Sequence, residues 1–188
     1  MKDVNIVAYS LTLSYTIYAD VKQYTSLKNL LKFKMTNDIM MNIERISNKL
    51  NELLIKNYDA EKGYKKAIEN VDNTRLTTFF TECSEDRSKF ASQIKTQILN
   101  LGETPKESGS FTGTMHRNWM DFKTIFTSND QKAILDEVVR GEKESLEDYN
   151  DFISETEIPE NIKTVLISHR NTIKNTIMKV PQLEEAVA

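Results

Sequence analysis

The side chains most able to do chemistry in this chain are polar residues that interrupt its apolar repeats. Four stretches carry apolar residues at three- and four-residue spacing, and each has polar residues at inward positions near its middle. These polar residues are Asn57, Glu61, Asp86, Arg87, Glu142 and His169. Carboxylates and imidazoles serve as metal ligands and as general acids or bases. A buried charge must be paired, hydrogen-bonded or bound to a metal, so we expect any chemistry of this protein at these residues.

The spacing of these residues from the predicted turns places them at one level of a helical bundle. In the first helical pair the polar residues lie at similar distances on either side of the turn at Asp72-Asn73. In the second pair Glu142 and His169 lie at similar distances from a turn near Glu157. If the helices pack side by side, the polar residues of all four meet near the middle of the bundle.

Iron or another divalent metal is one candidate occupant of this cluster, with candidate ligands Glu61, Asp86, Glu142 and His169. A carboxylate di-iron centre in a four-helix bundle uses Glu-x-x-His on two helices, because positions i and i+3 share one helix face. This sequence lacks that spacing, since Leu166 stands three residues before His169. The guanidinium of Arg87 would also repel metal ions. We therefore favour an internal cluster in which Arg87 and His169 contact Glu61 or Glu142, and we expect no cofactor.

Two glycines stand beside the carboxylates of this cluster, inside predicted helices. Gly63 follows Glu61, and Gly141 precedes Glu142. Glycine inside a helix is less favourable than alanine by about 0.5–1 kcal/mol. We expect these glycines to let a bulky neighbour such as Tyr64 or Arg87 approach the helix backbone closely.

Long helices must position these residues, because the chain has few residues that form tight turns. Only 5 Gly and 3 Pro occur among 188 residues, which argues against sandwiches and barrels. Helical periodicity predicts four long helices, over 39–71, 75–101, 131–153 and 159–180. The first two and the last two are joined by short turns, whereas Gly102 to Asp130 connect the pairs. Two antiparallel hairpins with one long crossover predict an all-α, ferritin-like four-helix bundle.

Turn and capping residues set the expected helix ends. We expect Gly102 to end the second helix, and Thr74 and the Ser128-Asn129-Asp130 stretch to cap the helices that follow them. Pro181 is expected to end the last helix. The crossover is expected to carry a short helix over 115–126, whose Trp119 plugs the bundle or, as an alternative, supports dimerisation.

The chain divides into three predicted parts, which are an N-terminal extension over 1–34, the bundle over 35–181 and a tail over 182–188. The extension is expected to be flexible or loosely docked, because hydroxyl residues interrupt its apolar stretch and Asp3 directly follows Lys2, unlike a targeting signal. Its Ser14–Tyr18 stretch alternates weakly, as an edge strand does. Met35 is also a candidate translation start.

Charge and cysteine content limit the classes of partner. The 25 basic and 28 acidic residues give a net charge of −3, so we expect no nucleic-acid partner. No apolar run is long enough to predict a membrane span. The single cysteine, Cys83, excludes an internal disulfide, lies on an apolar stripe as a core residue, and fits a cytoplasmic setting.

The chain resembles a family of bacterial ferritin-like four-helix-bundle proteins grouped as a domain of unknown function. The residues that carry the resemblance include Arg117, Trp119, Asp121 and Lys123 on the crossover and the Gly141-Glu142 pair. Family members usually carry a Cys-Glu pair where this chain has Val138-Val139, which removes a carboxylate from the centre. The resemblance implies a ferritin-like fold, and it implies no established activity.

Two functional interpretations follow from these observations. The leading interpretation is a non-enzymatic bundle that binds itself, as a homodimer, or a protein partner, with stress physiology as one setting. The alternative is a metal-binding ferritin-like protein with a non-standard site of carboxylates and one histidine, which holds either two metals or one.

Overall fold

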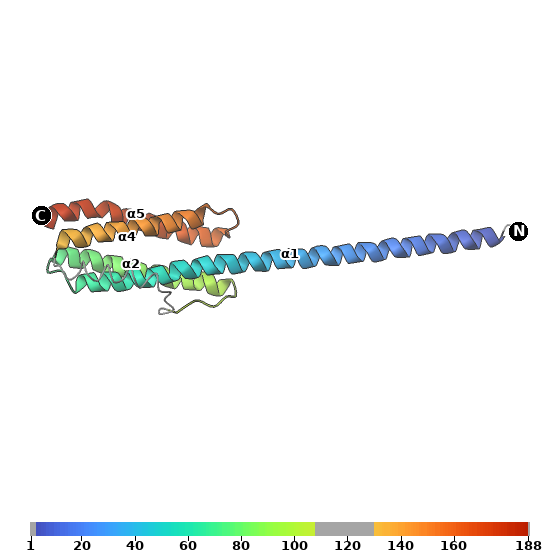
Figure 1. Cartoon of the computed structure of the whole chain (residues 1–188), viewed down its shortest axis with the longest axis horizontal. Coiled ribbons are helices and arrows are strands. Elements are labelled where there is room, and N and C mark those ends of the chain that lie inside the picture. Colours follow the sequence, from blue (N-terminus) through green and yellow to red (C-terminus); the bar gives the residue numbers. More distant parts are fainter. Residues whose placement is uncertain (1–2, 108–129, 188) are drawn as a thin grey trace. The chain divides into compact units, whose positions relative to one another are not determined.

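The computed structural model describes residues 3–107 and 130–187, and it describes side-chain burial for 22–107 and 130–185. All regular elements in these ranges are α-helices (Figure 1). They are α1 (Asp3–Ile68), α2 (Thr74–Asn100), α4 (Gln131–Ser154) and α5 (Glu160–Val187). The chain divides into two compact units, residues 1–43 and 44–188, and the second unit contains the helical bundle. The expected short helix over 115–126 lies outside the described residues.

Contacts between side chains show which helices of the bundle are neighbours. Between α1 and α4, Lys56 pairs with Asp148 and Tyr64 pairs with Glu142, so the two helices run in opposite directions. The α2–α5 pair is also antiparallel, with contacts Glu82–Lys179, Gln93–His169 and Gln97–Asn161. The short turns make α1–α2 and α4–α5 antiparallel hairpins.

These directions establish the topology of the bundle. Both α2 and α4 are antiparallel to α1, so they run parallel to each other (Figure 1). The end of α2 and the start of α4 therefore lie at opposite ends of the bundle, and a long connection joins them. This single long crossover between two hairpins is the ferritin-like arrangement, and the predicted fold class is confirmed.

Capping interactions explain where α2 and α4 begin and where α2 ends. Asp130 caps α4, as expected, and its side chain accepts hydrogen bonds from two backbone N–H groups of the first turn. Asn73 caps α2 in the same way, so the prediction that Thr74 is the cap is wrong. The backbone of Asn73 is extended, whereas Thr74 is already helical. Gly102 has a φ of 81° after the last residue of α2, which confirms it as the helix stop.

Three further predictions of local structure are wrong. Helix α1 begins at Asp3 and ends at Ile68, whereas the sequence predicts a first helix over 39–71. Helix α5 continues through Pro181 to Val187, although proline cannot donate the hydrogen bond that its position would normally make. Val180 and Leu183 pack on the core on either side of the proline, and we attribute the continued helix to this packing. The Ser14–Tyr18 stretch, which alternates as an edge strand does, is helical within α1. The division of the chain at residue 35 stays a prediction.

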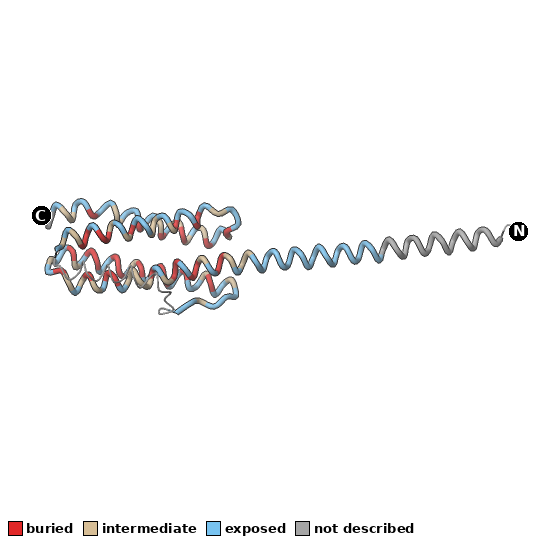
Figure 2. Tube along the Cα trace, viewed as in Figure 1, coloured by how far each residue is buried: buried red, intermediate tan, exposed pale blue. Residues whose placement is uncertain are grey.

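The core of the bundle consists of two apolar clusters that follow one another along the helices. The first cluster includes Ile46, Leu50, Leu54, Phe90, Ile94, Ile98, Tyr149, Phe152, Ile162 and Leu166. The second includes Tyr64, Ala67, Leu76, Phe79, Phe80, Cys83, Ile134, Leu135, Val138 and Val180. Buried residues line these helices, whereas residues 22–41 of α1 are exposed (Figure 2). On α1, α2 and α4 the residues between the clusters include the polar side chains of the candidate site.

Candidate functional site

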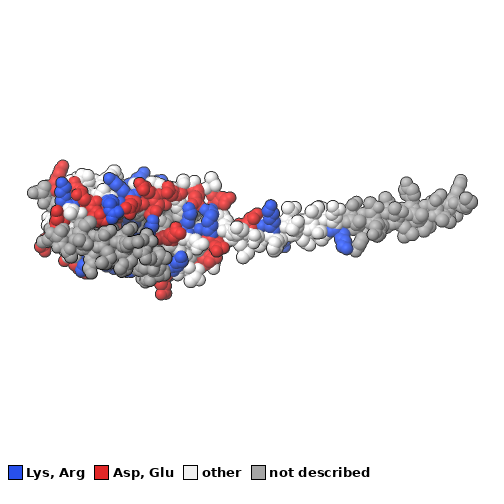
Figure 3. All heavy atoms as spheres, viewed as in Figure 1, with Lys and Arg blue, Asp and Glu red and all other residues white. Residues whose placement is uncertain are grey.

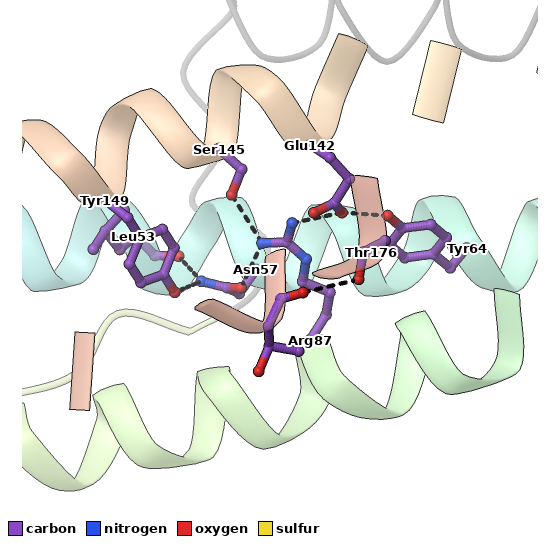
Figure 4. A network of polar contacts seen from close by, with 9 residues as sticks. Leu53, Asn57, Tyr64, Arg87, Glu142, Ser145, Tyr149 and Thr176 are labelled. Carbon is purple, nitrogen blue, oxygen red and sulfur yellow. Dashed lines mark hydrogen bonds and ion pairs between the residues drawn. The ribbon is translucent and has the colours of Figure 1, made fainter. Parts of the chain in front are cut away.

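Arg87 of α2 is the central residue of the polar layer between the two clusters (Figure 4). One terminal nitrogen, Nη2, donates to Oε1 of Glu142 at 2.6 Å. The other, Nη1, donates to Oδ1 of Asn57 at 3.1 Å and to Oγ of Ser145 at 2.9 Å. The side chains of Arg87 and Glu142 are each 4% exposed, so this is a buried ion pair. One guanidinium thus connects three helices through planar, directional donors.

Glu142 of α4 also accepts a hydrogen bond from the hydroxyl of Tyr64. Tyr64 lies on α1 and belongs to the second apolar cluster. Burial, reinforced by the adjacent carboxylate, raises the pKa of Tyr64 well above its ordinary value, so the phenol stays protonated and remains a donor. Burial alone would lower the pKa of Arg87, but the Glu142 carboxylate outweighs it and raises that pKa. The pair is therefore held as a full cation and anion that neutralise each other.

The layer continues from Arg87 toward α5 through hydrogen bonds. Nδ2 of Asn57 donates to the backbone oxygen of Leu53 at 2.7 Å and to the hydroxyl of Tyr149 at 3.0 Å. The Tyr149 hydroxyl lies 3.2 Å from Nδ1 of His169, and Nε2 of His169 lies 2.7 Å from Oε1 of Gln93. Oε1 of Gln93 can only accept, so Nε2 of His169 carries the proton and donates to it, and Nδ1 accepts from the Tyr149 hydroxyl. This arrangement requires a neutral imidazole.

The surroundings of His169 favour the same neutral form. Burial, with further contributions from the positive charges of Arg87 and Lys89, lowers the pKa of His169 to about 3. The ring of Phe90 stacks on the imidazole with 4.1 Å between ring centroids. His169 is thus a hydrogen-bonded core residue at neutral pH, and its two ring nitrogens are both engaged.

The structure brings four of the six candidate residues into one hydrogen-bonded network. Asn57, Arg87, Glu142 and His169 belong to it. Glu61 does not, since it is half-buried on α1 and pairs with Lys65 one turn along the same helix. Asp86 is half-buried on α2, and no ion pair among residues 3–107 and 130–187 includes it.

Of the residues that carry the family resemblance, the structure describes the Gly141-Glu142 pair. The crossover positions Arg117, Trp119, Asp121 and Lys123 lie outside the described residues. Gly141 lies within α4, and a Cβ built on it would meet nothing within 4 Å. The expectation that Gly141 allows a close approach of Tyr64 or Arg87 is therefore wrong. The bulky neighbours of this layer reach Glu142 with their terminal atoms, at a distance from the α4 backbone.

The residue types of the layer do not suit a metal ion. Within the part of the chain that the structure describes, no three His, Cys, Asp or Glu side chains form a group that could hold a metal. The layer supplies one carboxylate, and the cation that this carboxylate binds is the guanidinium of Arg87. Both ring nitrogens of His169 are used in hydrogen bonds to protein groups. A ferritin-type carboxylate centre therefore does not fit these side chains.

Sequence reasoning missed the two tyrosines and the glutamine of the network. Tyr64 and Tyr149 occupy apolar positions of their helices, and their hydroxyls reach into the polar layer from the two clusters. A usable signal exists for Tyr149, because it lies seven residues after Glu142 and so on the same face of α4. Gln93 is exposed on α2, and nothing in the sequence marks it as the partner of a buried histidine.

Cys83 is a core residue, as its position on an apolar stripe predicts. It is buried in the second cluster. Burial, with the negative charge of Glu142 as a further cause, raises the pKa of the Cys83 thiol to about 12. The sulfur is therefore a protonated thiol at neutral pH and lacks the thiolate character of a catalytic cysteine.

The surface of the bundle carries charges of both signs. Figure 3 shows lysine and arginine side chains interspersed with acidic ones on the described part of the face that it presents. Among the described helices, none is both long enough and apolar enough to cross a membrane.

Comparison with known proteins places the chain in a family. Residues 45–155, more than half of the chain, match the family described as "Domain of unknown function (DUF2383)". The fold is similar to the crystal structure of Dps92 from Deinococcus radiodurans, with a TM-score of 0.60 and 11% sequence identity, covering 76% of this chain and 87% of that one. No curated protein sequence matches the chain. This chain is therefore a ferritin-like four-helix-bundle protein that belongs to the DUF2383 family, whose function is unknown.

Proposed function

We propose that this protein is a non-enzymatic helical bundle that acts by binding itself or a protein partner, and that its central layer stabilises the bundle. The observation that carries the proposal is the complete pairing of the buried polar groups. In the part of the chain that the structure describes, every buried side-chain nitrogen or oxygen has a hydrogen-bond partner. A catalytic centre needs groups that are free to bind or transform a substrate, and this layer offers none.

The protonation states of the layer support a structural role. The pKa values of the buried groups are shifted away from neutral pH, so each group stays in one protonation state: Arg87 is charged, Tyr64 is protonated and His169 is neutral. General acids and bases work best when their pKa values lie near the working pH. A layer of this kind selects one register of the helices, because each donor must meet its own acceptor.

Exposed apolar side chains on residues 22–41 of α1 support a binding surface outside the bundle core. Residues 22–41 include large apolar side chains that are more than half exposed, among them Tyr24, Phe33 and Met40. Exposed apolar surface of this extent marks interaction sites in soluble proteins. The proposed binding activity therefore resides outside the central layer.

Metal content of the purified chain tests this proposal against the metal-binding alternative. The protein is purified without chelators, and iron, manganese and zinc are measured by mass spectrometry in the wild type and in Glu142→Ala. We expect substoichiometric metal in both. The matched control is Glu144→Ala, because Glu144 is an exposed carboxylate on the same helix. A stoichiometric metal that is retained in Glu144→Ala and lost in Glu142→Ala would contradict the proposal.

A further inference from the structure

Residues 22–41 of α1, the first for which side-chain burial is described, present a row of apolar side chains to solvent. Tyr24, Leu27, Leu31, Met35 and Ile39 follow each other at three- and four-residue steps, and we call them the N-terminal stripe. Their exposed fractions range from 52% for Leu27 to 69% for Tyr24. Residues at such steps lie on one side of a helix, so these side chains form a continuous surface.

The same spacing occurs where α1 enters the bundle. The stripe is followed at three- and four-residue steps by Ile43, Ile46 and Leu50, and the last two are buried. In the bundle this face of α1 is covered by other helices of the same chain. Residues 22–41 are exposed. A surface with this pattern is suited to another helix of the same kind.

We infer that the N-terminal stripe is a self-association surface, on which the stripe of a second copy of this chain packs. This inference deepens the proposed function and rests on it, because it names a second copy as the binding partner. The two helices bury their apolar stripes against each other, as in a two-stranded coiled coil.

The exposed area is adequate for such a dimer. Five large side chains, each more than half exposed, leave on the order of 600 Å² of surface on each chain. Two copies then bury roughly 1,200 Å², the lower end of the range for specific interfaces. A monomer that leaves this stripe in water would also carry a larger apolar patch than most soluble monomers tolerate.

Lysines beside the stripe set the salt dependence of this contact. Lys28, Lys32 and Lys34 flank the stripe, whereas Lys22 lies on the opposite side of the helix. Asp38 is the single acidic residue within residues 22–41. The long aliphatic stems of the flanking lysines cover apolar surface, whereas their ammonium groups repel those of the second copy. Added salt screens this repulsion, so association between copies is expected to strengthen with salt. Binding to an acidic partner or an anionic membrane would weaken instead.

Sedimentation velocity on the full chain tests the inference, with concentration and salt as variables. The test variant is Leu27→Ser/Leu31→Ser, which removes two stripe residues that are exposed and make no part of the bundle core. The matched control is Phe33→Ser/Met40→Ser, two exposed apolar residues on the opposite side of the helix. We expect the wild type and the control to dimerise. The dissociation constant of the test variant should be about 100-fold higher or more, because the loss of each buried leucine raises the dissociation constant more than tenfold.

Three results would overturn the inference. The wild type could remain monomeric up to about 100 μM, well above the dissociation constants of stable complexes. The test variant and the control could lose association equally, which would indicate general stickiness of the helix. The chain could also bind vesicles of anionic lipid as a monomer, with no dimer at any salt concentration. Circular dichroism of each variant checks that the helices are retained.

Failure of this inference and failure of the proposed function give different readouts. A stoichiometric metal that depends on Glu142 contradicts the proposed function and leaves the sedimentation result untouched. A wild-type chain that is monomeric and metal-free contradicts self-association, while the proposed binding of another protein still stands.

Discussion

Replacing Arg87 with methionine leaves the Glu142 carboxylate buried without the guanidinium that neutralises it. The substitution keeps a long, flexible apolar side chain at the position and removes the charge. Three hydrogen bonds are lost, to Glu142, Asn57 and Ser145. Tyr64 still donates to Glu142, but a neutral phenol does not replace a cation in a site that is 4% exposed.

The expected loss of unfolding free energy follows from the burial of both Arg87 and Glu142. Removing one partner of a buried ion pair costs about 3–5 kcal/mol, because the other charge is left uncompensated. We therefore expect Arg87→Met and Glu142→Leu each to lower the free energy of unfolding by roughly that amount. Replacing both partners removes the uncompensated charge, so the double variant should lose at least ~2 kcal/mol less than the sum of the single losses.

Urea unfolding followed by circular dichroism at 222 nm measures this double-mutant cycle. The matched control is Lys179→Met, since Lys179 of α5 also pairs with a carboxylate of another helix, Glu82 of α2, but the two side chains are 58% and 56% exposed. Ion pairs at such exposed positions are worth about 1 kcal/mol or less. Single-variant losses no larger than that of the control would refute the reasoning, as would a double variant that is additive within ~0.5 kcal/mol.

Further predictions concern the histidine, one tyrosine and two glycines. The pKa of His169 is lowered from 6.5 to about 3, so the unfolded chain binds more protons than the folded one between these values. The contribution of His169 is therefore complete above about pH 6.5 and is lost as the pH falls toward 3, with a slope of at most ~1.4 kcal/mol per pH unit. The stability difference between wild type and His169→Gln, measured by urea unfolding from pH 7 to pH 4, should shrink, and a constant difference would contradict this. Tyr149→Phe removes the hydroxyl between Asn57 and His169 and should cost about 1–3 kcal/mol in the same assay, so an unchanged midpoint would argue against the network. Gly141→Ala should stabilise α4 by about 0.5–1 kcal/mol, since a Cβ there meets nothing within 4 Å, whereas Gly102→Ala should destabilise by a similar amount because its φ is 81°. Thermal melts that shift in the same direction for both glycine variants would disprove this contrast.

The fold could be predicted because local signals in the sequence agree with one another. Apolar spacing marks the helices, and Asp130 and Gly102 mark two of their ends. The contrast between short turns and one long connection then selects the topology. The prediction failed at Pro181, where a strong local signal was overridden by the packing of Val180 and Leu183 on the core. Tertiary packing routinely outweighs local preference in this way.

The candidate site was only partly predictable. Interrupted apolar repeats identify Asn57, Arg87, Glu142 and His169 as inward polar residues. The same reasoning also selects Glu61, which is half-buried at the edge of the buried face and pairs with Lys65. A difference of one position on a helix turns a side chain by about 100°, so periodicity alone cannot separate a buried residue from one at the edge of the buried face.

The sequence by itself determined the helices of the bundle, their order and the presence of polar residues between their apolar stretches, although α1 begins at Asp3 and not at the predicted residue 39. These properties depend on spacing along one chain, and spacing is fully written in the sequence. Only the tertiary structure decided which polar atoms meet. It joins Arg87 to Glu142, places the Tyr64 and Tyr149 hydroxyls in the layer, and gives His169 two hydrogen-bond partners. The physical reason is that a hydrogen bond requires atoms from different helices to lie within about 3 Å, which depends on helix register and rotamer and not on residue type.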